Sequence, residues 1–409
     1  MRRAFRIALA PALTTLMLGS VAGAEPPRFE RGVNGDLWND WRPIADLMAD
    51  PEALAVFPDW RRNITPRMFE ILAEEGFDFI RLPIDPGPAI AYGPGPDQDR
   101  MIEGMRIAAD MALAAGLKVI VDLHPIPREG QVGGAESIVN DQWPNYVTLV
   151  GRIAARLADL PADRTALELL NEPAADCEAV YGDAPAAWPG MQAELHAAAR
   201  AAAPDLTIIL TGACWGSVAS LVTLDPDHIA DDNVIWTFHS YAPPTYTHQG
   251  AVWLWPPIKY IRDLPYPPSR MTDEIAAKVA ADAEARMIAA EGTADTEAIA
   301  KEIQTYRDTP DSAVSEDMTL AAQWADEHGI PRQRLLLGEF GALHTVDGVA
   351  QPMEWYHGFL SDKRRAAEDA GMGWAVLSWA GSMGVAQADD PDRRLSPDTC
   401  RALGLPCGN

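Results

Sequence analysis

The fold is indicated most clearly by a short run at residues 166–173, whose sequence is ALELLNEP. Apolar residues dominate its first five positions, and two polar residues, Asn171 and Glu172, then stand directly before Pro173. A short apolar run of this kind is typical of a strand that is buried on both faces of a parallel sheet. In barrels of parallel strands, polar residues at the carboxyl end of a strand line the active-site face. The run therefore predicts a parallel strand, 166–171, that ends in candidate functional residues.

Seven further β-rich runs alternate with longer amphipathic segments along the chain. They lie at residues 31–33, 77–82, 117–123, 206–211, 233–238, 334–339 and 373–379. Alanine-rich helical patterns between them include 101–115, 146–160 and 191–203. This alternation predicts an α/β fold of βα units, and eight units favour a (β/α)8 TIM barrel over an open doubly wound sheet. No Gly-x-Gly-x-x-Gly follows a predicted strand, which weighs against a dinucleotide-binding fold.

The spacing of the strands has one exception, between the sixth and the seventh. There, residues 247–310 carry Trp253, Trp255, several prolines and a charged, alanine-rich helical stretch from 273 to 306. We interpret 247–310 as a long insertion in the sixth βα loop, on the barrel face where active sites are built. No internal repeat and no Ser/Gly-rich linker is present, so residues 25–409 are predicted to form a single domain.

The first 24 residues have the three parts of a secretory signal peptide. Three arginines precede an apolar stretch, and residues 22–24, AGA, provide the small residues of a cleavage site. The stretch is too short and too interrupted by proline and threonine for a spanning helix. We expect cleavage after Ala24, a periplasmic or secreted protein, and no membrane contact after cleavage.

The four cysteines suit an oxidising compartment, because they are even in number and follow a predicted export signal. Cys400 and Cys407 enclose six residues, and we expect them to pair. Cys177 and Cys214 each follow a predicted strand, which makes a bridge between neighbouring loops plausible. Four free thiols are the alternative. No Cys/His spacing indicates a zinc site.

The net charge restricts the possible partners. The chain has 59 acidic and 33 basic residues and a formal charge of −26 at pH 7. A field of this sign repels phosphate backbones and anionic lipid headgroups, so we expect neither nucleic acid nor membrane as a partner. A neutral substrate fits the charge best. We expect a monomer that needs no cofactor and no metal.

Polar or aromatic residues stand at the end of almost every predicted strand. They are Arg81, His124, Asn171, Glu172, His239, Tyr241, Glu339 and Trp379. Each alone has an ordinary structural explanation, but together they are expected to meet at one rim of the barrel. Glu172 and Glu339 follow strands three apart in order, so their side chains are expected to face each other across the mouth. Glycoside hydrolysis requires such a pair, one carboxyl to protonate the leaving oxygen and one to attack the anomeric carbon.

Six motifs in order make the chain similar to a known family. They are Arg-Leu-Pro at 81–83, Asp-Leu-His at 122–124, Asn-Glu-Pro at 171–173, His-Ser-Tyr at 239–241, Gly-Glu-Phe-Gly at 338–341 and Ser-Trp at 378–379. Over residues 30 to 385 the chain resembles glycoside hydrolase family 5, the cellulase family of the retaining barrel clan. The resemblance implies a glycosidase that acts on a polysaccharide by double displacement.

The resemblance also implies a role for each motif residue. Glu172 would be the general acid/base and Glu339 the nucleophile. Tyr241 would hydrogen-bond the nucleophile, and Arg81 would hold its charge and orientation. Among the sugar contacts, Asn171 would reach the 2-hydroxyl, His124 and His239 would line the cleaved subsite, and Trp379 would be the platform under that sugar. A retaining enzyme has its two carboxyls about 5–5.5 Å apart, and we expect that separation here.

The substrate and three other functions stay open at this point. A cellulase-like endo-β-glucanase is the expected activity, with a β-mannanase or an exo-β-1,3-glucanase-type member as alternatives. A metal-dependent hydrolase would use His124, His239 and His344 beside the two glutamates, but the first strand lacks the expected His-x-His pair. A sugar-binding protein or a non-catalytic glycan-binding barrel is the remaining alternative.

Aromatic residues gather in the loops after the predicted strands. They are Trp38, Trp41, Trp143, Trp215, Tyr246, Trp253 and Trp255. Flat sugar faces stack on such rings, so these residues are candidate subsites of a polysaccharide cleft. About half of them are expected to be packing residues instead.

Overall fold

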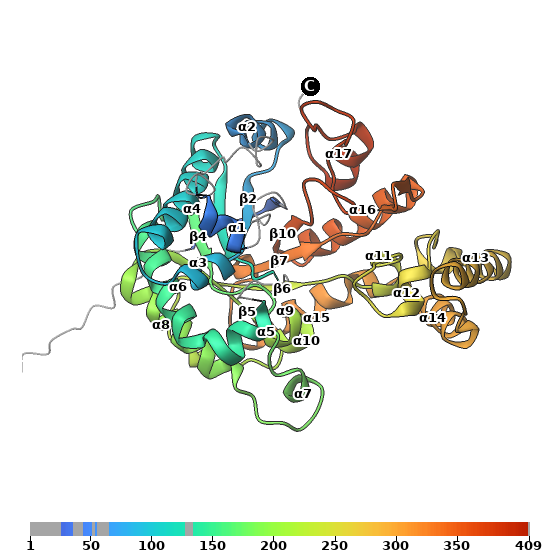
Figure 1. Ribbon diagram of the computed structural model, residues 1–409, viewed down its shortest axis with the longest axis horizontal. Coiled ribbons are helices and arrows are strands. Elements are labelled where there is room, and N and C mark those ends of the chain that lie inside the picture. Colours follow the sequence, from blue (N-terminus) through green and yellow to red (C-terminus); the bar gives the residue numbers. More distant parts are fainter. Residues whose placement is uncertain (1–25, 36–43, 51–53, 55–64, 127–133, 408–409) are drawn as a thin grey trace, which may run out of the picture.

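A closed barrel of parallel strands forms the centre of the molecule, shown in the computed structural model of Figure 1. The structure describes residues 26–35, 44–50, 54, 65–126 and 134–407. Within these residues, eight strands close the barrel in the order β1-β10-β7-β6-β5-β4-β3-β2. They are β1 (Arg31–Asn34), β2 (Phe79–Ile84), β3 (Lys118–Leu123), β4 (Thr165–Glu168), β5 (Thr207–Thr211), β6 (Val234–His239), β7 (Leu335–Phe340) and β10 (Gly373–Val376). The predicted (β/α)8 barrel is confirmed, and each strand overlaps a predicted run.

Helices cover the outside of the barrel (Figure 1). The main ones are α2 (Pro66–Glu75), α4 (Pro96–Ala114), α6 (Trp143–Leu157), α8 (Trp188–Ala202), α15 (Ala313–Glu327) and α16 (Met353–Asp369). Proline in the first turn starts several of them, as Pro66 does in α2. The same helix ends at Gly76, whose φ of 99° is the left-handed conformation that glycine adopts without strain. Their buried faces join one hydrophobic core with the outward-facing side of the strands.

The amino-terminal half of the barrel interior is filled by one apolar layer. Strands β2 to β7 and β10 each contribute one residue to this layer, and Phe29 closes it from below β1. Its members are Phe29, Phe79, Ile120, Ala166, Ile209, Ile235, Leu336 and Ala375. Phe29 and Phe79 meet edge to face at 5.2 Å. Small residues at two positions of the layer leave room for these rings, so the interior is a packed core and not a channel.

Inward-facing residues recur every second position along a strand, so the layer above the apolar one is also set by the strands. Two positions after Phe79, Ile120 and Ala166 come Arg81, Asp122 and Glu168, all buried. The barrel therefore changes from apolar to charged within a single step along three neighbouring strands.

Strand β4 is shorter than the predicted run, because it ends at Glu168 and not at Asn171. The chain nevertheless stays on the barrel wall. The amide of Leu169 donates to the carbonyl of Ile209, and the amide of Asn171 donates to that of Leu123. Asn171 and Glu172 are thereby held at the mouth, just beyond the ladder.

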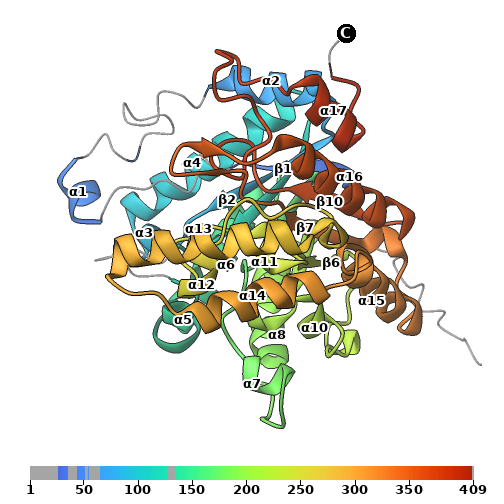
Figure 2. The ribbon, with the colours of Figure 1, turned by 90° about the vertical axis from the view of Figure 1, so that its right-hand side faces the viewer.

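The segment between β6 and α15 extends away from the barrel (Figure 1). It contains α11 (Pro244–Thr247), α12 (Pro256–Tyr260), α13 (Asp273–Glu291) and α14 (Thr296–Asp308). The single helical stretch expected at 273–306 is two helices, because Gly292 ends α13 in the left-handed conformation. Figure 2 shows the two helices side by side. The interpretation of 247–310 as an insertion within one domain stays a prediction.

Some sequence predictions concern residues that the structure does not describe. The predicted signal peptide, residues 1–24, and the two tryptophans Trp38 and Trp41 lie outside the described residues. No helix among the described residues has the length and apolar character that crossing a membrane requires.

The fit between β1 and the apolar layer yields a testable prediction. A Cβ added at Gly32 would lie 2.1 Å from the ring of Phe79, so Gly32→Ala forces a displacement inside a close-packed layer. We expect the free energy of unfolding to fall by about 1–3 kcal/mol in urea titrations. The matched control is Gly190→Ala in α8, where a Cβ meets nothing within 4 Å. It should stabilise by about 0.5–1 kcal/mol, and equal effects of both changes would contradict this account of the layer.

Candidate active site

One buried arginine organises the carboxyl end of the barrel. Arg81 on β2 is 0% exposed, and its guanidinium contacts residues from four other segments. Nε and Nη2 donate to the two oxygens of Glu168, each at 2.8 Å. Nη1 donates to Asn34 Oδ1 and to Glu339 Oε1, each at 2.7 Å. Nη2 also donates to Asn171 Oδ1 at 2.8 Å and lies 2.9 Å from Asp122 Oδ2.

Glu339 near the end of β7 is held as a carboxylate by this cation and by a phenol. Arg81 occupies Oε1, and the hydroxyl of Tyr241 donates to Oε2 at 2.7 Å. Burial raises the pKa of Glu339, but the charges of His239, Arg81 and His124 and the Tyr241 hydrogen bond outweigh burial. The net result is a pKa well below the ordinary value, so Glu339 is ionised at neutral pH.

Glu172 lies opposite, in a more open position. Its side chain is 29% exposed, whereas that of Glu339 is 4% exposed. His239 lies between the two carboxylates, with Nδ1 2.8 Å from Glu172 Oε1 and 3.4 Å from Glu339 Oε2. One oxygen of each glutamate and one ring nitrogen of His239 all lie within 4.8 Å of one another. The two carboxylates predicted from the sequence therefore come together at one mouth, one buried and one accessible to water.

Two further predicted residues line the same mouth. His124 Nδ1 lies 2.9 Å from Asp122 Oδ2, and its Nε2 lies 3.2 Å from Asn171 Nδ2. Burial lowers the pKa of His124, but the charge and hydrogen bond of Asp122 outweigh it and raise the pKa overall. The amide oxygen of Asn171 is held by Arg81, which fixes the direction of its amide group.

Trp379, the predicted platform under the sugar, is deeply buried. It is 1% exposed and joins the hydrophobic core after β10. Its backbone amide donates to the carbonyl of Asn34. The ring is therefore enclosed by protein, and the expected role of Trp379 as a platform under the sugar stays a prediction.

The candidate cleft aromatics divide into packed and exposed rings. Tyr246 is buried against Tyr266, Tyr306 and Phe359, so it belongs to the packing residues that were expected within this group. Trp143 packs near Tyr146 and donates its indole N–H to Glu194. Three of the described tryptophans in this group are at least half exposed, namely Trp215, Trp253 and Trp255.

The two glycines of the motif at 338–341 are required by close approach. A Cβ at Gly338 would lie 2.4 Å from Thr237 Oγ1 and 3.3 Å from His239 Nε2. A Cβ at Gly341 would lie 2.1 Å from the carbonyl oxygen of Leu377. Neither position has room for a side chain, so both glycines fix the path of the chain on either side of Glu339.

Sequence reasoning missed the buried charges below the mouth. Glu168 was included in an apolar run, yet it makes the bidentate pair with Arg81. Burial raises its pKa, with Asp122 adding to the rise and Arg81 opposing it. The available signal was one acid within each apolar run, Asp122 in 119–123 and Glu168 in 166–170, at positions that face the barrel interior.

A second missed group lies behind β6. Lys363 on α16 is fully buried, and its Nζ donates to Ser240 Oγ at 2.8 Å. Ser240 is also hydrogen-bonded to Asp317 on α15, and its amide donates to the carbonyl of Glu339. Burial lowers the pKa of Lys363 to about 8, with Asp317 opposing the shift. This group fixes the turn between His239 and Tyr241, and the charged surroundings of Lys363 in the sequence gave no sign of its burial.

Both expected disulfides are present. Cys177–Cys214 joins α7 (Cys177–Val180), five residues beyond Glu172, to α9 (Ala213–Gly216), which carries Trp215. Cys214 and Trp215 also donate backbone hydrogen bonds to the carbonyls of Ala175 and Pro173. Glu172, Cys214 and Trp215 all have positive φ, which non-glycine residues keep only where surrounding contacts impose it. The bridge is one of the contacts that tie these two loops together.

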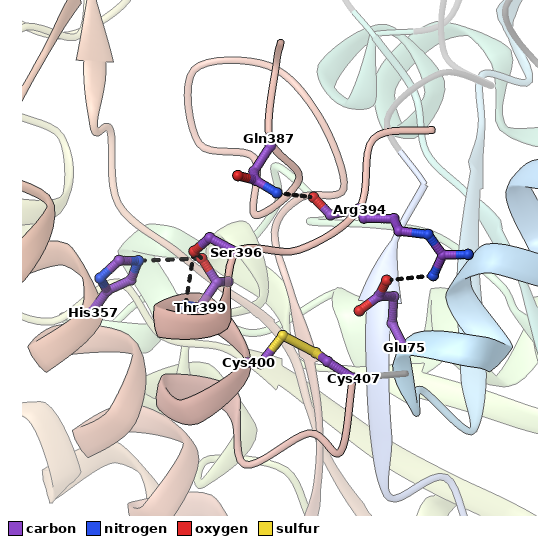
Figure 3. The surroundings of a disulfide bond; sticks show 8 residues. All are labelled: Glu75, His357, Gln387, Arg394, Ser396, Thr399, Cys400 and Cys407. Carbon is purple, nitrogen blue, oxygen red and sulfur yellow. Dashed lines mark hydrogen bonds and ion pairs between the residues drawn. A yellow bond between two sulfur atoms is a disulfide. The ribbon is translucent and has the colours of Figure 1, made fainter. Parts of the chain in front are cut away.

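Cys400–Cys407 lies elsewhere, between α17 (Pro397–Leu403) and the last described residues (Figure 3). The amide of Cys407 donates to the carbonyl of Glu75 at the end of α2, where the chain turns into β2. Arg394 also reaches Glu75, at 2.9 Å. This bridge therefore lies toward the end of the barrel opposite the glutamates.

A metal site is the alternative interpretation of the groups at the mouth of the barrel. Glu172, His239 and Glu339 lie close enough to share an ion. However, both oxygens of Glu339 are already taken by Arg81 and Tyr241, and His344 is bonded to the carbonyl of Gly384 instead of joining the group. The residues present do not fit a metal as well as they fit a pair of catalytic carboxyls.

A barrel with paired glutamates at its carboxyl mouth is the architecture of a glycoside hydrolase. The family model described as cellulase (glycosyl hydrolase family 5) matches residues 49–382. The chain therefore belongs to glycosyl hydrolase family 5, as its motifs indicated.

Among curated proteins, the chain is similar to endoglucanase 3 of Fibrobacter succinogenes, at 25% identity over 82% of this chain and 48% of that protein. It is also similar to cellodextrinase A of Ruminococcus flavefaciens, at 30% identity over 44% of this chain and 52% of that protein. A glucan 1,3-β-glucosidase of Blumeria graminis matches at 30% identity over 36% of this chain and 37% of that protein. The chain thus spans about half or less of the length of these relatives.

Solved structures share the fold. An endoglucanase superposes with a TM-score of 0.64 at 20% identity, over 93% of this chain and 97% of that one. Thermotoga maritima Cel5A with cellobiose gives 0.62 at 21% identity, over 92% and 97%. The cellulose synthase subunit Z of Clostridioides difficile gives 0.62 at 18% identity, over 92% and 99%. At these identities the likeness establishes the architecture alone.

The arginine at the centre of the site predicts a pH-dependent loss of stability. Arg81→Met leaves Glu168, Asp122 and Glu339 without their shared cation, and breaking a buried pair costs about 3–5 kcal/mol. Arg81 lowers the pKa of both Glu168 and Glu339, so its loss raises both, and protonation in acid then relieves the unpaired charge. Urea titrations should show a larger loss at pH 8 than at pH 5.

The control is Arg332→Met, which removes an exposed pair with Asp326. It should leave the free energy of unfolding close to the wild-type value at both pH values, because solvent screens an exposed pair. A loss from Arg81→Met that is the same at both pH values would refute the shared-cation account.

The disulfide beside the site predicts a selective effect on activity. Replacing Cys177 and Cys214 by serine removes a constraint on the loops of Glu172 and Trp215, and kcat/KM for glycoside hydrolysis should fall at least about tenfold. By restricting the unfolded chain, this bridge stabilises the fold by about 4 kcal/mol, and the shorter Cys400–Cys407 loop stabilises it by about 2.5 kcal/mol.

The matched control replaces Cys400 and Cys407 by serine. It should lower the melting temperature while kcat/KM, measured well below melting, stays within about twofold. The idea that the first bridge positions the site fails if the two double variants lose activity equally.

Proposed function

We propose that this chain is a retaining glycoside hydrolase that cleaves β-glucosidic linkages in a neutral polysaccharide. One observation carries the proposal: two glutamates with oxygens within 4.8 Å of each other, one buried and held ionised, the other open to water. Oxygens within this bound favour the roughly 5–5.5 Å carboxyl separation of retaining enzymes over the roughly 6.5–9.5 Å that leaves room for a water in inverting ones.

Glu339 is the proposed nucleophile. Its low pKa keeps it a carboxylate, and Arg81 and Tyr241 fix the direction of its oxygens before substrate arrives. It attacks the anomeric carbon and forms a glycosyl ester, which neutralises its charge. The Arg81 pairing with Glu168 and Asp122 is retained through that step, so the positive charge is not left uncompensated.

Glu172 is the proposed acid and base. It gives a proton to the leaving glycosidic oxygen, then accepts one from the water that hydrolyses the ester. Its partial exposure gives that water access, and its contact with His239 Nδ1 orients the carboxyl. Asn171 and His124, held by Arg81 and Asp122, are the proposed contacts to hydroxyls of the cleaved sugar.

The exposed ring of Trp215 is the proposed stacking surface beside the acid/base residue. Its backbone is bound to Pro173, the residue after Glu172, so the ring has a fixed position relative to the leaving-group side. Apolar sugar faces bind such rings, and the strongly acidic chain favours an uncharged glycan.

An endo-β-1,4-glucanase is the favoured activity, because a relative that matches 82% of this chain is named an endoglucanase. An exo-acting β-1,3-glucanase is the second candidate, since several similar curated proteins are named glucan 1,3-β-glucosidases. A β-mannanase is the third. We also propose that the protein works outside the cytoplasm, which the two disulfides support.

Reducing-end release from β-1,4-glucan, mixed-linkage glucan, β-1,3-glucan and β-mannan tests the proposal. The wild type should cut one of these with initial release of the β-anomer, seen by proton NMR. Glu339→Gln should lower kcat at least about 10⁴-fold, whereas adding EDTA should not change the rate. Initial release of the α-anomer would refute retention, and chelator-sensitive activity would favour the metal alternative.

An acid/base assignment can be separated from a nucleophile assignment by added azide. Glu172→Ala should be slow on substrates with poor leaving groups, because the first step then lacks its acid. On an activated dinitrophenyl glycoside, azide should raise the rate of this variant and yield a β-glycosyl azide, because the anion attacks the glycosyl-enzyme where water needs a base. Glu339→Ala should instead yield an α-glycosyl azide. The reverse pattern would exchange the two roles.

A further inference from the structure

An exposed apolar patch lies on the turn between α11 and α12. Val252 is 66% exposed, Trp253 60% and Trp255 51%, within four consecutive residues. Large exposed apolar side chains that occur together mark an interaction site more often than single ones do. In Figure 1, α11 and α12 lie between the barrel strands and the α13–α14 pair, on the side of β6 and β7.

The backbone that carries this patch is fixed, although the rings are not covered. Ala251, Leu343 and Val346 form a small buried cluster, and Leu254 packs against it. The amide of Leu343 donates to the carbonyl of Thr247, and the amide of Gly250 donates to that of Ile258. Leu343 follows Glu339 by four residues, so the turn is anchored to the loop that leaves the proposed nucleophile.

A row of ring contacts connects the patch to the catalytic carboxylate. Tyr241 donates to Glu339 and meets His248 edge to face at 5.0 Å between ring centroids. His248 in turn meets Trp253 edge to face at 6.5 Å. Trp253 is therefore two ring contacts away from the residue that binds Glu339.

His248 is suited to act as a neutral spacer in this row. Burial lowers its pKa to about 4, with a backbone hydrogen bond to Pro244 opposing the shift. Its Nδ1 lies 3.0 Å from Thr247 Oγ1. The rings of Tyr241 and Trp253 face His248, and neither is charged at neutral pH. The three rings therefore present no charge to a ligand.

We propose that Trp253, supported by Trp255, is an outer subsite that stacks a glycosyl unit of the polysaccharide chain beyond the unit held at Glu339. The proposal rests on the proposed function and extends it from the cleaved sugar to the length of chain bound. Its occupant is a neutral pyranose unit, because an uncharged, flat apolar face fits an exposed indole, and the strongly acidic chain disfavours anionic ligands.

The subsite predicts a dependence on substrate length. Trp253→Ala should lower the ratio of kcat/KM on the polymer to kcat/KM on a nitrophenyl β-cellobioside about three- to tenfold, mainly through KM on the polymer. Trp253→Phe retains a ring and should restore most of the ratio. Leu320→Ala removes an exposed apolar side chain from α15 and should leave the ratio at the wild-type value.

Failure of the inference and failure of the proposed function give different results. If the wild type is active but Trp253→Ala and Trp255→Ala leave the ratio unchanged, the subsite is overturned and the catalytic proposal stands. If the wild type cuts none of the polymers, affinity electrophoresis in gels that contain each polymer tests the subsite through binding alone. Retardation that is lost in Trp253→Ala supports the subsite, and equal mobility of both proteins overturns it.

Light scattering gives a further decisive outcome. A wild-type dimer that Trp253→Ala converts to a monomer, with an unchanged length dependence, would show that the patch binds a second copy of the chain and would overturn the subsite. Because the ring is exposed, the variants should keep the wild-type melting temperature within a few degrees, and Trp255→Ala provides an independent test if Trp253→Ala does not.

Discussion

The site depends on a single buried cation. Arg81 is fully enclosed in the barrel, and its five donors are shared among Glu168, Asn34, Glu339, Asn171 and Asp122. Removing such a group from water is unfavourable unless every donor is satisfied. The planar guanidinium satisfies this requirement by binding carboxylates from three strands at once, which also fixes their relative positions. Arg81 thus fixes one oxygen of Glu339 and the amide of Asn171, and it keeps Glu339 ionised together with His239, His124 and Tyr241.

The barrel supplies the setting that makes this cation useful. An apolar layer closes the interior from below, and the charged layer begins one inward step above it on the same strands. Water is therefore excluded beneath the carboxylates, while the loops after the strands keep Glu172 partly open. A low dielectric strengthens the interaction of Arg81 with Glu339, and preorganised charges of this kind need no rearrangement when substrate binds. The same two-layer arrangement thus produces one buried, ionised carboxyl and one accessible carboxyl.

The sequence was sufficient for the architecture and for the residues at the strand ends. Alternating β-rich runs and helical patterns depend on local periodicity, which a sequence displays directly. It was insufficient where burial depends on distant segments. Tyr246 is covered by rings from the segment after β6 and from α16, and Trp379 is enclosed after β10. Lys363 stands among charged helix residues, and only the packing of α15 and α16 behind β6 shows that it binds Ser240. Glu168 and Asp122 were visible as acids but not as partners of Arg81.

The central claim is that Glu339 becomes covalently bound to the sugar. Incubation with a 2-deoxy-2-fluoro-β-cellobioside that has a good leaving group should slow hydrolysis of the ester and allow it to accumulate. Peptide mass spectrometry should then find one added 2-deoxy-2-fluorocellobiosyl group on the peptide that contains Glu339 and none on the peptide that contains Glu172. A label on Glu172, or inactivation without any glycosyl adduct in an enzyme that hydrolyses cellobiosides, would contradict the account.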